Sequence, residues 1–529
     1  MFCRESVPPG LGAADEKKGE TIMEKRFLVL PVNDAHEAEP WFLRSGDRLL
    51  QDIAAAVDPE NPVFEAYVDI TRFGEVPMTL TNRAGKEIPV RIADRMPLPE
   101  EIPNWGRLRP AGHFTTRLGW INDPNGLVYA DGLYHMFYQH NPAGWRWGNM
   151  TWGHAVSQDL MHWDEWGDAI FPDELGTMFS GSAVVDERNV SGLGAGAILR
   201  FYTAAGSTSD LSKDQPSTQC MAWSNDGGRT FRKYDKNPLI TSLAPGNRDP
   251  KVQWAEELGK YTLSIFLIDH DYMMFTSDDL IHWTPFQKLD MPLDGECPDF
   301  YPLVSEQGQR KWVFSGASDT YLVGDLDKDG FHADQEALRY QMKPGISYAA
   351  QTFSGTGDRR IKLYWEQVTP EGALFNSQMS MPMEVTLTKV GDLWRLRQLP
   401  SPEWDRLLKA EEVLNVTGSG RQVLKDTGAA LDVQVEIPEN CPAFTVSCRN
   451  MDVQVDPAKG VYTHGECEAP LSYDGKRCLR LIFDNLSADV FADDGLIYTA
   501  FKAEPIGDAP LAICSEAPVS LKVTLRELA

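Results

Sequence analysis

Short runs in which apolar and polar residues alternate make up most of this chain, and apolar residues at helical spacing are scarce. The runs are bounded by Gly, Asp, Asn and Pro, and four examples are Leu133–Tyr138, Leu199–Thr203, Tyr261–Leu267 and Lys311–Ser315. A period of two places successive side chains on opposite faces of a β-strand, whereas a helix needs a period near 3.6. The pattern therefore predicts an all-β protein.

A short segment recurs three times in the middle of the chain. Its copies are S-Q-D-L-M-H-W (Ser157–Trp163), the looser S-N-D-G-G-R-T-F (Ser224–Phe231) and S-D-D-L-I-H-W (Ser277–Trp283), which start 67 and 53 residues apart. Each copy follows a predicted strand and is typical of a hairpin turn that leads into the next one. A unit of about 60 residues leaves room for five units between His113 and residue 395, which favours a five-bladed β-propeller. The alternative is one common turn type used three times.

The segments on either side of the repeat region are organised differently. Residues 23–105 contain short β-runs and end in the Pro-rich link M-P-L-P-E-E-I-P-N-W, which predicts a small β-domain. Residues 106–400 hold the predicted propeller, and residues 401–529 alternate as the strands of a β-sandwich do. We expect residues 1–22 to be a disordered N-terminal extension.

Composition and charge limit the kinds of molecule that the protein is expected to bind. The chain has 529 residues, of which 42% are hydrophobic and 24% charged, as in ordinary soluble proteins of two or three domains. Fifty Lys and Arg against 77 Asp and Glu leave a formal net charge of −27. Nucleic acids and anionic membranes need basic patches, so neither is expected as a partner, whereas a neutral substrate fits. A homo-oligomer is left open.

The eight cysteines contain no C-x-x-C pair, so a zinc site is not expected. Free buried thiols in a reducing compartment are the simpler interpretation, although one or two disulfides among the four cysteines from 441 to 478 are left open.

The sequence also bears on the predicted location of the protein. No stretch approaches the eighteen apolar residues that a membrane helix needs, and the first ten residues lack the apolar segment of a signal peptide. The apolar run Phe27–Val32 is only six residues long, and we interpret it as a β-strand. We therefore expect a cytoplasmic protein.

Three carboxylate residues stand directly before a proline, or one residue further ahead of it, near predicted strand ends. They are Asp123 in W-I-N-D-P-N-G, Asp249 in N-R-D-P-K-V and Glu296 in G-E-C-P-D-F, which lie 126 and 47 residues apart. Proline fixes its own φ and biases the preceding residue toward extended geometry, so these local sequences are stiff. Because a propeller gathers one end of each innermost strand around its axis, the three acids can meet in one funnel although they come from different blades.

At these residues the chain closely resembles glycoside hydrolase family 32, the invertases, levanases and inulinases, over roughly His113 to Asp405. The matching blocks, in order, are H-F-T-T-R-L-G-W-I-N-D-P-N-G, F-Y-Q-H-N-P, W-G-N-M-T-W-G-H-A-V-S, F-S-G-S-A-V-V-D, R-D-P-K-V, E-C-P-D and Y-A-A-Q-T-F. The resemblance implies a five-bladed propeller followed by a sandwich. The first hundred residues resemble an accessory β-domain found on some bacterial members.

The resemblance implies retaining hydrolysis of terminal β-fructofuranosides through a covalent fructosyl-enzyme intermediate. Asp123 would be the nucleophile, Glu296 the general acid/base and Asp249 a stabiliser of the transition state. Such a double displacement needs two carboxyl groups about 5–5.5 Å apart, one ionised and one protonated. Neither a metal nor a cofactor is expected.

The same resemblance implies a set of substrate contacts. They are Asn122, Gln139, Trp147, Phe179, Ser180, Arg248, Tyr348 and Trp365. Amide and hydroxyl groups suit a neutral sugar, and aromatic rings suit its apolar face. We interpret Cys297, next to the acid, as a packed thiol rather than a modulator of the site.

Two departures from the family pattern concern the part of the site beyond the fructosyl pocket. Gly295 stands where the family commonly has Trp, and Met383 in S-M-P-M-E stands where Arg is expected. The choice among sucrose, inulin-type and levan-type substrates is therefore left open. We expect sucrose or short fructo-oligosaccharides, cleaved from the non-reducing end.

Other functions use the same scaffold. A fructosyltransferase would share the covalent intermediate and pass the fructosyl group to a sugar instead of water. A non-catalytic fructan-binding protein would have lost one of the acids, and all three are present here. An arabinan-cleaving enzyme fits less well, because W-I-N-D-P-N-G with E-C-P-D is the fructosidase pattern.

Overall fold

Strands dominate the structure, a computed structural model that describes residues 24–103, 105–426, 430–449, 451–503 and 510–528. The helices among the described residues are η1 (Thr71–Phe73), η2 (Pro99–Glu101), α1 (Trp105–Leu108), η3 (Pro402–Leu407) and η4 (Asp493–Gly495). The prediction of an all-β protein is confirmed. In the described segments, no helix has the length and apolar character needed to cross a membrane. The predicted disordered extension lies outside the described residues.

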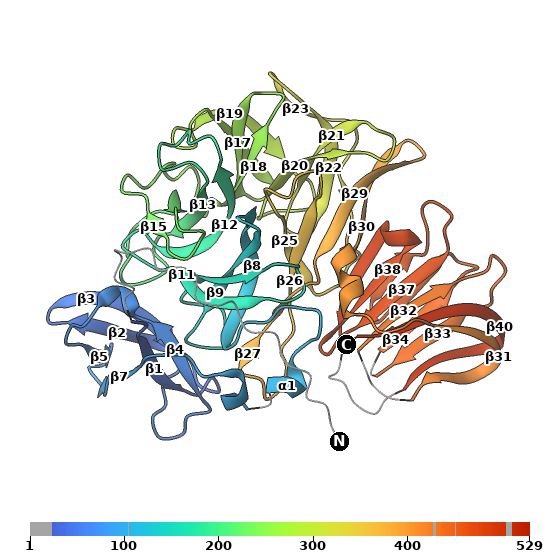
Figure 1. The fold of residues 1–529 in the computed structure, drawn as a ribbon, viewed down its shortest axis with the longest axis horizontal. Helices are drawn as coiled ribbons and strands as arrows, with labels where there is room; N and C mark the ends of the chain where they lie inside the picture. Colours follow the sequence, from blue (N-terminus) through green and yellow to red (C-terminus); the bar gives the residue numbers. More distant parts are fainter. Residues whose placement is uncertain (1–23, 104, 427–429, 450, 504–509, 529) are drawn as a thin grey trace.

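Five antiparallel sheets form the predicted propeller (Figure 1). The first is β8 (Gly119–Ala130), β9 (Leu133–Asn141), β10 (Thr151–Ser157) and β11 (Asp164–Ile170). The second is β12 (Thr177–Asp186), β13 (Ala197–Ala205), β14 (Thr218–Ser224) and β15 (Arg232–Lys233), and the third is β16 (Arg248–Ala255), β17 (Lys260–Ile268), β18 (Asp271–Ser277) and β19 (Thr284–Asp290). The fourth is β20 (Asp299–Val304), β21 (Arg310–Ser315), β22 (Thr320–Asp327), β23 (Gly330–Ala333) and β24 (Leu338–Arg339). The fifth is β25 (Ser347–Thr352), β26 (Ile361–Glu366), β28 (Gln378–Met379), β29 (Met383–Val390) and β30 (Leu393–Pro400).

Contacts between the fifth and first sheets close the ring. The short strand β27 (Phe375–Asn376) pairs in parallel with the start of β8, where Phe375 lies opposite Gly119. An isolated bridge joins Val128 of β8 to Ser354, just after β25. A closed ring fixes the innermost strands relative to one another, which is what a site built from several sheets requires.

The three copies of the repeated segment are turns between the third and fourth strands of successive sheets. In the first copy the Asp159 side chain accepts hydrogen bonds from the backbone N–H groups of Met161 and His162 at 3.0 and 2.9 Å. In the third copy Asp279 accepts the equivalent two bonds at 2.9 and 2.8 Å. The interpretation of this segment as a hairpin turn is therefore confirmed.

The C-terminal strands form a sandwich in which two long strands run through both layers (Figure 1). The strands are β31 (Glu412–Lys425), β32 (Leu431–Glu436), β33 (Phe444–Cys448), β34 (Met451–Asp456), β35 (Val461–His464), β36 (Cys467–Pro470), β37 (Cys478–Phe483), β38 (Ser487–Ala492), β39 (Ile497–Lys502) and β40 (Leu511–Glu527). One half of β40 pairs with β33 and the other half with β32, while β31 follows it along nearly its whole length. The predicted fold class is confirmed.

Two small sheets precede the propeller. They contain β1 (Phe27–Val32), β4 (Phe64–Asp69) and β7 (Arg91–Ala93) in one, and β2 (Glu39–Ser45), β3 (Arg48–Ala55), β5 (Thr79–Asn82) and β6 (Glu87–Ile88) in the other. Their apolar faces share one core that includes Leu30, Trp41 and Val68. We call residues 24–93 the N-terminal β-domain. Figure 1 shows it beside the first sheet of the propeller, near β9 and β11.

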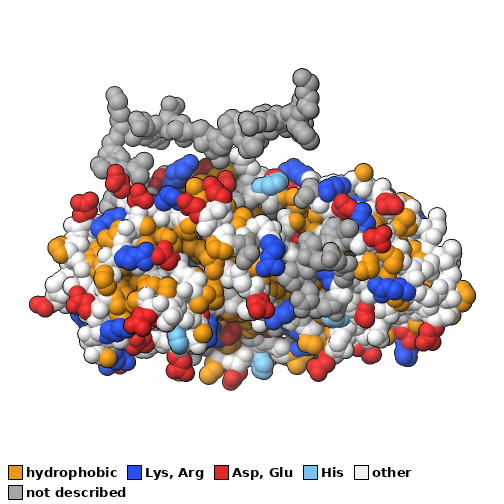
Figure 2. Space-filling model, turned by 90° about the horizontal axis from the view of Figure 1, so that it is seen from below, with side chains coloured by type: hydrophobic (Ala, Val, Ile, Leu, Met, Phe, Trp, Pro, Cys, Tyr) orange, Lys and Arg blue, Asp and Glu red, His pale blue; other side chains and the backbone are white. Residues whose placement is uncertain are grey.

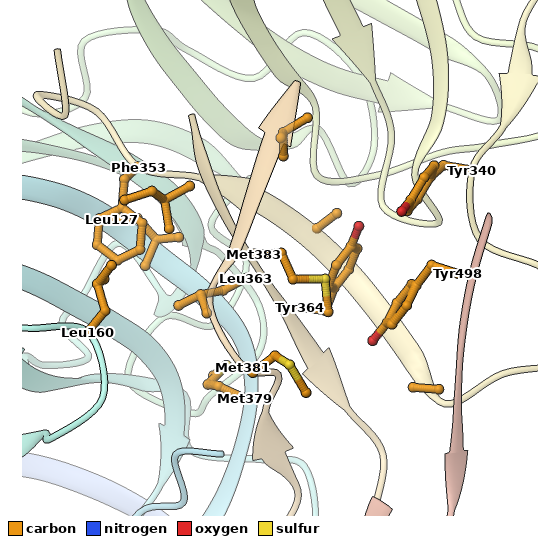
Figure 3. Close-up of a cluster of buried hydrophobic side chains, with 14 of the residues drawn as sticks. Leu127, Leu160, Tyr340, Phe353, Leu363, Tyr364, Met379, Met381, Met383 and Tyr498 are labelled. Carbon is orange, nitrogen blue, oxygen red and sulfur yellow. The ribbon is translucent and has the colours of Figure 1, made fainter. Parts of the chain in front are cut away.

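The largest apolar cluster joins the propeller to the sandwich (Figure 3). Tyr498 of β39 stacks on Tyr364 of β26 with ring centroids 5.8 Å apart, and on Tyr340 at 6.2 Å. Met383 is completely buried in this cluster. An arginine at this position would place a charge in an apolar core, so Met383 is suited to its packing here.

The distribution of charged side chains on the surface and the state of the cysteines can be compared with what the composition predicted. Acidic and basic side chains are interspersed on the face shown in Figure 2. All seven cysteines of the described residues are free, and five of them are buried. The interpretation as buried free thiols fits five of these positions, and the reducing compartment stays a prediction.

Candidate active site

The innermost strands β8, β12, β16 and β25 all begin at the same mouth of the ring, and the loop before β20 reaches the same place. Parallel innermost strands bring their first residues together, so side chains from distant parts of the sequence share one site. The three predicted acids occupy these positions: Asp123 lies in β8, Asp249 in β16 and Glu296 in the loop before β20.

Asp123 lies at an irregularity in β8. The pairing of β8 with β9 shifts register between Ile121 and Pro124, so the chain bulges at the acid. Its carboxylate accepts hydrogen bonds from the Ser180 hydroxyl and, at 3.1 Å, from the Asn122 amide. These donors hold the group in one orientation and stabilise its ionised form.

Asp249 is nearly buried and has left-handed backbone geometry, with a φ of 65°. This conformation is stabilised by its own N–H group, which donates to the Thr203 hydroxyl at 3.0 Å. The Arg248 guanidinium lies 3.8 Å from the Asp249 carboxylate. Asp249 is thus fixed by Arg248, its neighbour in sequence, and by Thr203 of the second propeller sheet.

Glu296 also has positive φ, at 59°, and its side chain is 36% exposed. One carboxylate oxygen accepts from Arg248, and the other accepts from the Tyr348 hydroxyl at 2.7 Å. The Tyr272 hydroxyl donates to the Glu296 backbone carbonyl at 3.1 Å. The two donors fix the orientation of the Glu296 side chain, and its exposure lets a leaving group and then water reach it.

Cys297 joins the acids into one cluster. Its thiol lies 3.5 Å from a carboxylate oxygen of Asp123 and 3.6 Å from one of Asp249, and its N–H donates to Asp249 at 3.0 Å. Arg248 connects Asp249 to Glu296. The thiol is buried beside Ala317 and Ala349, as a packed residue would be, and it also contacts two acids of the site.

Burial and the close packing of the acids raise the pKa values of two of them, Asp249 and Asp123. Burial raises the pKa of Asp249 to about 7, and the negative charges of Asp123 and Glu296 add to the rise, while Arg248 opposes it. Burial also raises the pKa of Asp123, and hydrogen bonds from Ser180 and Asn122 act in the opposite direction. The site therefore concentrates negative charge, which a positively charged transition state would relieve.

The eight predicted substrate contacts lie around these acids. Asn122, Gln139 and Ser180 contact Asp123, and Arg248 and Tyr348 contact Glu296. Trp147 and Phe179 meet edge to face with centroids 5.7 Å apart, and Trp365 meets Trp120 at the same distance.

Two of these side chains have buried polar atoms without a partner among the described residues. They are the Gln139 amide oxygen and the Trp365 indole N–H group. A buried polar atom left unpaired is unfavourable, so either atom would gain from a hydrogen bond to any group that reaches it. The roles of all eight residues stay predictions.

Sequence reasoning missed several residues that support the acids. Thr203 holds the backbone of Asp249, Tyr272 holds that of Glu296, and Phe266 lies under the Arg248 guanidinium with 4.6 Å between centroid and carbon. Each sits in a strand whose alternating pattern predicts only packing, so no local motif marks it.

The departure at Gly295 has a steric cause. A Cβ atom at this position would lie 2.9 Å from the Asp269 carbonyl oxygen and 3.4 Å from the Phe266 ring. The hairpin between β17 and β18 therefore fills the space that a side chain at residue 295 would need.

A five-bladed propeller with carboxyl groups gathered at one mouth is the arrangement found in glycosidases that work through two acids. The sequence profile of the "Glycosyl hydrolases family 32 N-terminal domain" matches residues 113–400. The chain therefore belongs to glycosyl hydrolase family 32, as the sequence analysis predicted.

Known proteins that are similar to this chain include a levanase, an invertase and an exo-inulinase. The chain is 32% identical to the levanase of Bacillus subtilis over 73% of its own length and 65% of the levanase, just under two thirds of that protein. It is 30% identical to the invertase of Schizosaccharomyces pombe over 75% of this chain and 72% of the invertase. The exo-inulinase structure from Aspergillus awamori aligns with a TM-score of 0.71 and 25% identity, covering 80% of this chain and 98% of the inulinase.

Proposed function

We propose that this protein hydrolyses terminal β-D-fructofuranosides with retention of configuration. The observation that carries the proposal is the convergence of Asp123, Asp249 and Glu296 around Cys297 and Arg248. Two carboxyl groups of different environment at one mouth are what a double displacement needs.

Each acid has a step in the proposed reaction. Asp123 attacks the anomeric carbon C2 while Glu296 protonates the leaving oxygen, which breaks the glycosidic bond and forms a fructosyl ester. Glu296 then takes a proton from water, and that water attacks C2 and releases Asp123. Asp249 stabilises the positive charge that develops on the sugar ring and accepts hydrogen bonds from its hydroxyl groups.

Arg248 and Tyr348 act on Glu296 rather than on the sugar carbon. Both donate to its carboxylate, one to each oxygen. They orient the acid toward the leaving group, and a displacement of about 1 Å at such a position lowers rates by orders of magnitude.

Two variants test the roles. Asp123→Asn should lose at least about 10³-fold in kcat on every fructoside, because no nucleophile is left. Glu296→Gln should lose about 10²–10⁴-fold on sucrose but recover on an aryl fructoside, whose leaving group needs no proton. Glu187→Gln, an exposed residue just after β12, is the control. Equal losses on good and poor leaving groups would contradict the assignment of Glu296.

We propose sucrose and short fructo-oligosaccharides of levan or inulin type as substrates, cleaved one fructose at a time. The similarity to proteins named levanase, invertase and exo-inulinase supports this range. Incubation with sucrose, levanbiose, inulin and levan, followed by separation of products, would rank these substrates. Oligosaccharides longer than the substrate would instead indicate fructosyl transfer, and binding without products would indicate a fructan-binding protein.

The cytoplasmic location and the homo-oligomer stay predictions. Cell fractionation would test the location, and light scattering would test the oligomeric state.

A further inference from the structure

The segment between β9 and β10 carries Trp147 and is held by the N-terminal β-domain. Ala143 belongs to the apolar core of that domain, and Trp145 stacks on Phe64 of β4 with centroids 4.4 Å apart and an interplanar angle of 15°. Stacked aromatic rings of this kind fix both position and tilt. The start of the segment is therefore part of the N-terminal core.

Asp34 fixes the middle of the segment. Its carboxylate accepts a hydrogen bond from the Trp145 N–H group, and its backbone carbonyl accepts one from the Arg146 guanidinium at 2.7 Å. On the propeller side, the Asn376 amide donates to the Trp145 carbonyl at 2.7 Å. The two backbone groups of Trp145 are thus held from opposite sides, one by each domain.

Asn149 fixes the end of the segment. Its amide group forms two hydrogen bonds with the backbone of Ala54 in β3, one accepted from N–H at 2.7 Å and one donated to the carbonyl at 2.8 Å. A second propeller loop adds to the same interface, since Asp210 pairs with Arg83. Figure 1 shows the N-terminal strands β3 and β4 against this side of the propeller.

Trp147 lies between these fixed points and faces the site. Its side chain is 54% exposed, and its ring meets Phe179, the residue before Ser180, which donates to Asp123. An exposed ring on a free loop would lose conformational freedom when a sugar packs against it, whereas a fixed ring has already lost it.

We propose that the N-terminal β-domain, by holding the segment between β9 and β10, positions Trp147 for sugar binding, with Asp34 as the main positioning residue. The proposal rests on the proposed function and assigns the domain to the substrate affinity of that same site. It follows that changes in this domain alter KM for fructosides although none of its residues reaches the acids.

A double-mutant cycle tests the proposal. Asp34→Ala should raise KM for sucrose and a short fructo-oligosaccharide about 5-fold or more, with kcat changed less than about 3-fold. Asp34→Asn should restore most of the loss, because an amide oxygen still accepts from Trp145. In a Trp147→Ala background, Asp34→Ala should have little further effect. Asp47→Ala, on the exposed turn between β2 and β3, is the matched control.

Hydrogen exchange separates this proposal from the proposed function. In Asp34→Ala, the amides of residues 143–149 should exchange about 10-fold faster or more, whether or not the protein cleaves fructosides. Asn149→Ala provides a second variant should Asp34→Ala fail to fold. Unchanged exchange and KM in a folded variant would overturn the proposal, and so would an equal effect of Asp34→Ala with and without Trp147.

Discussion

At the residue scale, the acids of the site depend on backbone geometry that few L-residues adopt. Asp249, Glu296 and Cys297 all have positive φ, at 65°, 59° and 36°. Such geometry costs of order 1–3 kcal/mol at each residue and persists only where surrounding contacts impose it. Asp249 precedes a proline and was expected to be extended by that rule, but the hydrogen bond from its N–H to Thr203 favours the left-handed form.

The hydrogen bond from Ser180 to Asp123 leads to a prediction about pH. This bond lowers the pKa of Asp123, so Ser180→Ala should raise it. Because the proposed nucleophile must be ionised, the acid limb of the kcat/KM profile should move to higher pH. Ser182→Ala should leave the limb in place, since Ser182 donates to the Pro250 carbonyl and not to an acid. An unmoved limb in Ser180→Ala would contradict the assignment of Asp123.

At the element scale, the innermost strands are irregular where they carry site residues. Register shifts fall between Ile121 and Pro124 in β8, between Phe179 and Gly181 in β12, and between Arg248 and Lys251 in β16. A bulge redirects a side chain that regular pairing would place in the sheet. The residues redirected are Asp123, Ser180 and Asp249, so the bulges determine the direction in which these three side chains point.

Gly181 tests the bulge in β12. A Cβ atom there would lie 1.9 Å from the Phe201 carbonyl oxygen, so Gly181→Ala must push β12 and β13 apart. We expect a loss of about 1–3 kcal/mol in the free energy of unfolding, with a fall in kcat because Ser180 shifts. Urea unfolding with kinetics measures both. Gly106→Ala, where nothing lies within 4 Å, is the control, and equal behaviour of the two variants would refute the steric argument.

At the scale of the whole molecule, a buried polar cluster joins the propeller to the sandwich. His113 lies 2.8 Å from Asp484, 3.3 Å from Asp489 and 3.6 Å from Glu366, and all four side chains are fully buried or nearly so. Burial opposes protonation of His113, but the three acids outweigh it and raise its pKa well above its usual range. Burial and Asp489 raise the pKa of Glu366 to about 8.

The cluster predicts that stability falls as pH rises. His113 and Glu366 both bind protons more tightly in the folded state than in the unfolded chain, so folding is favoured at lower pH between about 5 and 8. The lowered pKa of Asp484 acts only below its ordinary value near 3.8, outside this window. Between pH 5 and pH 8, calorimetry should show a larger fall in melting temperature for the wild type than for Glu366→Gln. Glu371→Gln, an exposed glutamate in the turn between β26 and β27, should follow the wild type, and parallel wild-type and Glu366→Gln curves would contradict the prediction.

The sequence by itself determined the strands and the blade repeat, and its resemblance to the family predicts the three acids. Period-two alternation and turns such as S-x-D-L-x-x-W are encoded within a few residues, so they can be recognised one segment at a time. The motif W-I-N-D-P-N-G predicts Asp123 through the family resemblance. These features depend on local sterics and solvation, which the chain carries wherever it folds.

Only the tertiary structure decided how those parts meet. The contacts of Cys297 with two acids, the burial of Met383 and the support of Trp147 by Asp34 each join residues far apart in sequence. Their geometry is set by closure of the ring and by the docking of domains, where many weak contacts are satisfied together. No single segment contains that information, because each contact exists only when both of its partners have been placed.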